Sequence, residues 1–105
     1  MRIIKTKDWY DPEGLNIPSN AEVVFEGSYE ACREELEDLR SKFIVQFADR
    51  DDIDVYAIKT KKEIVEKIPA PGGGYYIKSK ELPQSEYFEI YYSSAICKVY
   101  YSIVK

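Results

Sequence analysis

The chain has 105 residues, with 15 basic and 19 acidic side chains that give a formal net charge of −4. Hydrophobic residues at 45% and charged residues at 32% are typical of a folded protein, and the length suits a single domain over residues 1–105. Histidine is absent, which excludes histidine triads, histidine general bases and histidine metal ligands. No apolar run approaches the roughly 18 residues that cross a bilayer, and the charged N-terminus does not resemble a secretory signal. We therefore expect a cytoplasmic protein with no membrane association.

The first part of the chain predicts two strands separated by a loop. Residues 2–10 mix β-branched and aromatic side chains, which favours a strand or an extended arm. Residues 11–20 contain two prolines, one glycine and two asparagines, so their turn chemistry predicts a loop. Residues 21–26 return to an apolar, β-branched composition and predict a second strand.

The clearest element is an amphipathic helix over about 28–43. Ser28 can cap its N-terminus, and apolar residues then recur at spacings of three and four, which places them on one side of a helix. This stripe consists of Tyr29, Cys32, Leu36, Leu39 and Phe43. The opposite face is acidic and includes Glu34, Glu35, Glu37 and Asp38. Residues 43–48 fit either one more turn of this helix or the start of a strand.

The middle of the chain is ambiguous between helix and strand. Residues 53–59 predict a strand. Thr60 and Glu63 then have the spacing of a capping box, and the apolar residues up to Pro69 fit two turns of helix. The same residues could also continue the strand. We favour a short helix over 61–68.

The C-terminal third predicts β-structure. Residues 69–74 form a proline- and glycine-rich connector, 75–78 a short strand, and 81–84 another turn. Residues 86–92 and 96–104 are expected to form an antiparallel hairpin. The predicted fold is therefore α+β, an antiparallel sheet of about five strands with the main helix packed on one face.

Two local patterns suggest a ligand site, and each lacks a required residue. In the acidic run from Asp49 to Asp54, a calcium loop counted from Asp49 or from Asp51 has no glycine at its sixth position and no glutamate at its twelfth. The glycines at 72–74 are not followed by the Lys-Ser/Thr of a phosphate loop. Cys32 and Cys97 fall at predicted core positions and are expected to be buried and inert. We therefore expect no enzyme activity, no cofactor and no metal.

Two surfaces are candidates for binding. In the C-terminal hairpin, strand alternation places Tyr87, Tyr91 and Tyr100 on the face away from the helix, beside Glu89 and Lys98. Exposed tyrosines are common in binding surfaces, although aromatic pairs also stabilise sheets without any further role. The second candidate is the acidic face of the helix.

These features predict a small acidic binding protein that occupies a surface of another macromolecule, most simply a protein with a basic surface. One form of this hypothesis is a viral or mobile-element inhibitor of a host nucleic-acid enzyme, in the manner of anti-CRISPR proteins and nucleic-acid mimics. The negative net charge argues against nonspecific binding of nucleic acid, although it does not exclude a local basic patch. We also expect no direct sequence-specific binding of nucleic acid.

Two alternatives stay open. The first is a module that binds a small ligand such as a nucleotide through Tyr75, Tyr76 and Lys78 next to the Gly72–Gly74 loop. The second is a homo-oligomeric structural module in which the tyrosine face of the C-terminal hairpin is the interface.

Overall fold

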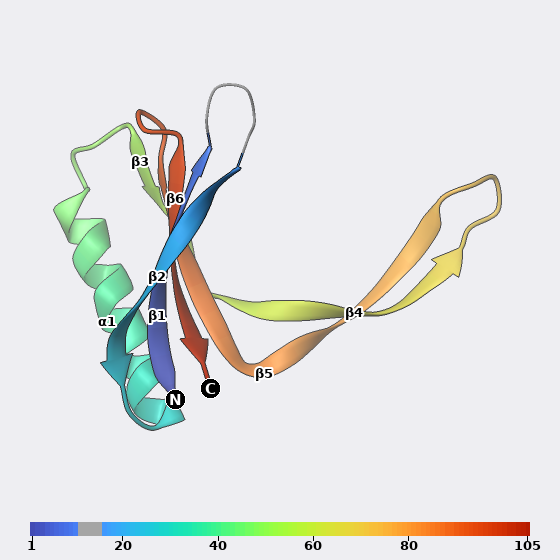
Figure 1. Cartoon of the computed structure of the whole chain (residues 1–105), viewed down its shortest axis with the longest axis horizontal. Coiled ribbons are helices and arrows are strands. Elements are labelled where there is room, and N and C mark those ends of the chain that lie inside the picture. The colour runs from blue at the N-terminus through green and yellow to red at the C-terminus, as the bar shows by residue number, and fades with distance from the viewer. Residues whose placement is uncertain (11–15) are drawn as a thin grey trace.

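A computed structural model of the chain describes residues 1–10 and 16–105, and the side chains of 1–8 and 21–105. Within these ranges the chain forms six strands and one helix. In chain order the elements are β1 (Arg2–Tyr10), β2 (Asn16–Glu26), α1 (Tyr29–Gln46), β3 (Ile53–Val55), β4 (Lys59–Pro69), β5 (Tyr75–Tyr92) and β6 (Cys97–Val104). The strands make one antiparallel sheet in the order β2-β1-β6-β5-β3, and β4 pairs with β5 outside this row (Figure 1). The predicted α+β fold with one main helix is confirmed.

Helix α1 forms as its sequence pattern predicts. The Ser28 hydroxyl accepts a hydrogen bond from the Ala31 N–H at 3.1 Å, which caps the N-terminus. Cys32 and Leu36, from the predicted apolar stripe, are fully buried, and the rest of the stripe packs against the core. The ambiguity at 43–48 is settled in favour of the helix, which continues to Gln46.

The core lies between α1 and one face of the sheet. Strand β6 alternates fully, with Cys97, Val99, Tyr101 and Ile103 buried and the residues between them half-buried. The rings of Phe88 and Tyr101 stack at a centroid distance of 5.1 Å. Both cysteines are buried free thiols, as predicted. The β5–β6 hairpin is also confirmed.

The N-terminal strands differ from the prediction in one respect. Residues 16–20, predicted as part of a loop, belong to β2 and pair with β1, whereas 11–15 lie outside the described residues. The ladder shifts register between the pairs Lys7–Asn20 and Trp9–Ile17. This irregularity falls at Pro18, where a residue without an N–H is tolerated in a strand. Turn-forming residues were therefore accommodated inside a strand.

The predicted helix over 61–68 is wrong. These residues form strand β4, which pairs with the first part of β5, for example Ile68 opposite Tyr76. Three consecutive glycines, 72–74, take positive φ angles that close the connecting turn, a backbone conformation that costs glycine little. The β-branched side chains of Ile64 and Val65 then favour the extended conformation over a two-turn helix.

Strand β5 is bent where β4 joins the body of the protein. The ladder pairs Thr60 with Glu86 and next Lys62 with Glu81, so residues 82–85 loop out of it. Gln84 has a φ of 57°, and the Ser85 hydroxyl donates to the Leu82 carbonyl at 2.6 Å. The turn predicted at 81–84 is therefore an elbow within one long strand. Beyond it, the paired strands project away from the helix and the rest of the sheet (Figure 1).

The projection makes the molecule elongated. Its extents are 48 × 38 × 25 Å and its radius of gyration over Cα atoms is 16.4 Å. A compact domain of this length has a radius of gyration of about 13 Å. The feature that most needs a functional explanation is therefore the projecting pair of strands.

Candidate binding arm

We define the arm as residues 59–82, which comprise β4, the connecting turn and the part of β5 up to the elbow. The buried core cluster and the partly buried residues packed against it contain no arm residue. The arm nevertheless carries six large apolar side chains with between 43% and 66% of their surface exposed: Ile64, Val65, Ile68, Tyr75, Tyr76 and Ile77. A two-stranded hairpin in water is marginally stable at best, so this apolar surface needs a reason other than folding.

The arm also has the opposite charge to the rest of the chain. It contains six lysines and three glutamates, a net charge of +3, whereas the remaining residues contain nine basic and sixteen acidic side chains, a net charge of −7. The modest overall charge is therefore the sum of a basic arm and an acidic remainder of the chain.

Cross-strand charge pairs support the hairpin in the absence of a core. Three lysine–glutamate pairs face each other across the ladder: Lys62 with Glu81, Glu63 with Lys80, and Glu66 with Lys78. The Lys80 Nζ lies 3.5 Å from a Glu63 carboxylate oxygen. Such opposed pairs each contribute roughly 0.2–1 kcal/mol.

The other three arm lysines do not stand opposite a carboxylate. Lys59 lies opposite Tyr87, Lys67 lies opposite Ile77, and Lys61 falls at a register shift. These lysines account for the arm's excess positive charge.

The two faces of the arm present different side chains. Residues directly opposite each other in a ladder share a face, so Ile77 and Lys67 lie on the same side as Tyr75 and Ile64. Tyr76 points to the other side. The structure therefore does not bring Tyr75 and Tyr76 together, and they cannot stack on both sides of one base. Lys78 shares the face of Tyr76 and lies opposite Glu66.

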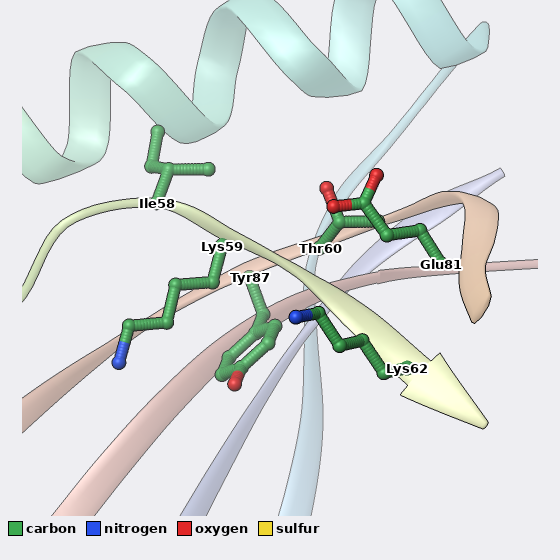
Figure 2. A pocket seen from close by; sticks show the side chains of 6 residues that line it. All are labelled: Ile58, Lys59, Thr60, Lys62, Glu81 and Tyr87. Carbon is green, nitrogen blue, oxygen red and sulfur yellow. The ribbon is translucent and has the colours of Figure 1, made fainter. Parts of the chain in front are cut away.

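The arm joins the body at a hollow of about 560 Å³. Figure 2 shows its lining residues, with Lys59 and Lys62 on either side of the Tyr87 ring in that view. A further hollow of about 410 Å³ is lined by Lys61 from the arm together with Tyr87 and Tyr100 from the sheet. The root of the arm thus borders the outer face of the sheet.

A hydrogen bond connects the root of the arm to the helix. The Tyr29 hydroxyl, in the first turn of α1, donates to a carboxylate oxygen of Glu86, just beyond the elbow. This bond to Glu86 is the main reason that the pKa of Tyr29 is raised, and burial adds to it. The contact holds the start of the helix against the strand that carries the arm.

The structure places both predicted binding surfaces on the body. Tyr87, Tyr91 and Tyr100 share the sheet face opposite the core and are half-buried. Between them the Lys98 Nζ lies 3.8 Å from a Glu89 carboxylate oxygen. In the β5–β6 ladder Tyr91 lies opposite Lys98 and Tyr100 opposite Glu89, and the partial burial of the tyrosines limits how far they project toward a partner.

On the helix, Glu34, Glu37 and Asp38 are exposed and Glu35 is half-buried. Glu37 forms an ion pair with Arg33 at 2.8 Å. The predicted acidic face is therefore present at the surface, and part of its charge is neutralised within the helix.

Sequence reasoning missed the arm, although a signal was present. Two charged runs, one rich in β-branched and the other in aromatic side chains, flank the Pro-Gly-Gly-Gly segment at 71–74, and lysines and glutamates in one run face their opposites in the other. Strand-like runs on either side of a glycine turn are typical of a hairpin.

Comparisons with known proteins give no assignment. No family model matches the chain, and no curated protein or solved structure shows significant similarity to it. Among the described residues, no helix combines the length and apolar composition needed to cross a membrane. In the same part of the chain, no group of three or more metal-ligating side chains is placed to hold an ion. The function is therefore inferred from the chain's own geometry.

Proposed function

We propose that this protein is a non-catalytic binding protein that holds a partner protein with its arm. The observation that carries this proposal is the set of six exposed apolar side chains on a projection that shares no residue with the core. Large apolar side chains exposed together on one projection are typical of an interaction site. Tyr75 and Tyr76 are of the type that dominates binding energy in protein interfaces.

The arm's composition favours a protein partner over a nucleic acid. Affinity for nucleic acid depends on lysines and arginines that neutralise phosphates, and three of the six arm lysines stand opposite glutamates. The aliphatic side chains of Ile64, Ile68 and Ile77 suit an apolar protein surface. The complementary partner surface combines apolar side chains with carboxylates.

The thiols support the non-catalytic part of this proposal. Burial raises the pKa of the Cys97 thiol, which disfavours the nucleophilic thiolate. Cys32 lies on the buried face of α1 and is fully buried.

Site-specific photo-cross-linking in the cells that make the protein tests this function. A photoreactive amino acid replaces Tyr76 on the arm in one variant, and replaces the exposed Lys105 in a control variant. We expect protease-sensitive adducts from position 76 and few from position 105. Excess unlabelled full-length chain should compete with these adducts. Equal adducts from both positions, or adducts removed by nuclease, would overturn the proposal.

A further inference from the structure

We propose that the partner of the arm is a second copy of this chain, and that the arm of one copy lies along the outward face of α1 in the other. This inference rests on the proposed function of the arm and adds the identity of its partner. Its first support is charge: the arm carries +3 and the remaining residues −7. An arm-to-arm contact would bring like charges together, whereas an arm-to-body contact brings opposite charges together.

The outward face of α1 carries the chemistry that complements the arm. Glu34, Asp38, Ser41 and Val45 follow one another at spacings of four, three and four, so they lie on one side of the helix. All four are exposed, and Val45, at 77%, is the most exposed of the large hydrophobic side chains described. The stripe therefore runs from two carboxylates at one end to an apolar side chain at the other.

One face of the arm has the matching order of groups. Lys67 stands opposite Ile77 rather than a carboxylate, and Ile64 lies on the same face three residues earlier. A register shift between Ile64 and Glu66 leaves Ile64 opposite Ser79, two residues from Ile77 on the facing strand, so Ile64 and Lys67 lie about 7 Å apart along the arm. Asp38 and Val45, seven residues apart on the helix, are separated by about 10 Å. A lysine over Asp38 therefore directs an isoleucine toward the Val45 end of the helix stripe.

In the proposed dimer a two-fold axis relates the two copies, so that the contact between arm and helix is made twice. Two-fold symmetry is the commonest symmetry of homodimers. The acidic face of the helix in each copy then contacts a basic protein surface, which is the arm of the other copy.

Sedimentation equilibrium of the full-length chain and of charge-swap variants tests this proposal. We expect the wild-type mass to rise with concentration toward twice 12.2 kDa. Lys67→Glu and Asp38→Lys should each raise the dimer dissociation constant at least about tenfold, because each places like charges in contact. The double variant should recover most of the affinity. Lys105→Glu, a charge change away from both surfaces, should leave it unchanged. All three substituted residues are exposed, and circular dichroism checks that the variants fold.

The outcomes separate this proposal from the function of the arm. A wild-type chain that stays monomeric overturns the homodimer, as does a dimer that neither single swap weakens. If the chain stays monomeric while position 76 still cross-links to another protein, the homodimer is rejected and the binding role of the arm stands. If position 76 also gives no specific adduct, both proposals are rejected.

Discussion

Removing the arm should leave the body folded, because the arm supplies no residue to the core. The ladder pairs Lys62 directly with Glu81, so residues 63–80 can be replaced by Asn-Gly, which closes a two-residue hairpin between directly opposed positions. All nine buried residues of the core cluster are retained. The deleted segment is a two-stranded hairpin with little net stability of its own. In protein dilute enough to be monomeric, we therefore expect the unfolding free energy to change by about 1 kcal/mol or less, which is roughly 4–8 °C in Tm for a domain of this size.

Urea and thermal unfolding followed by circular dichroism measure this effect. Phe88→Ala in the full-length chain is the matched comparison, because Phe88 is fully buried and stacks on Tyr101. That substitution should cost about 3–5 kcal/mol. The reasoning would be refuted if the truncated variant lost cooperative unfolding, or lost as much stability as Phe88→Ala.

Three further predictions concern the body. Ser28→Ala removes the cap on the Ala31 N–H and should lower the unfolding free energy by about 1 kcal/mol in urea titrations, whereas Ser41→Ala on the exposed helix face should not. Tyr29→Phe removes the donor to Glu86 and should cost about 1 kcal/mol, with faster amide exchange at the root of the arm; unchanged exchange there would contradict the role of this bond. Burial raises the pKa of Tyr101 from 10.0 to about 12, so the stability it contributes is complete below pH 10 and is lost as the pH rises toward 12. Tyr101→Phe should therefore flatten the alkaline part of a plot of urea midpoint against pH. An unchanged slope would show that the loss of stability at high pH does not come from ionisation of Tyr101.

The helix and the C-terminal hairpin could be predicted because their signals are local. In α1 the cap residue Ser28 and an apolar stripe agree on the same helix. In β6 the alternation of Cys97, Val99 and Tyr101 with less apolar residues defines the buried face without reference to any other element. Where the local conformational preference and the pattern of buried side chains indicate the same element, the sequence is sufficient to predict that element.

The arm could not be predicted in the same way, because its structure depends on a distant partner strand. The spacing of Ile64, Val65 and Ile68 fits a helix and a strand equally, and pairing with residues 75–81 decides between them. The pattern of buried side chains does not distinguish a helix from a strand here, because β4 is mostly exposed. The candidate site was missed for this reason: its apolar residues do not form a core face, which is the pattern that sequence analysis detects.

The central claim is that the arm folds independently of the core and binds a second copy of the chain. Amide hydrogen exchange of the full-length chain at low and high protein concentration tests this claim most directly. We expect the amides of residues 63–80 to exchange far faster than those of Phe88 and Ile90 in the dilute protein, because the hairpin is not anchored by the core. At high concentration the same arm amides, together with the side of α1 that carries Asp38 and Val45, should become protected. Arm amides that exchange as slowly as the core at low concentration would contradict the independence of the arm from the core, and arm amides whose exchange does not change with concentration would contradict the homodimer.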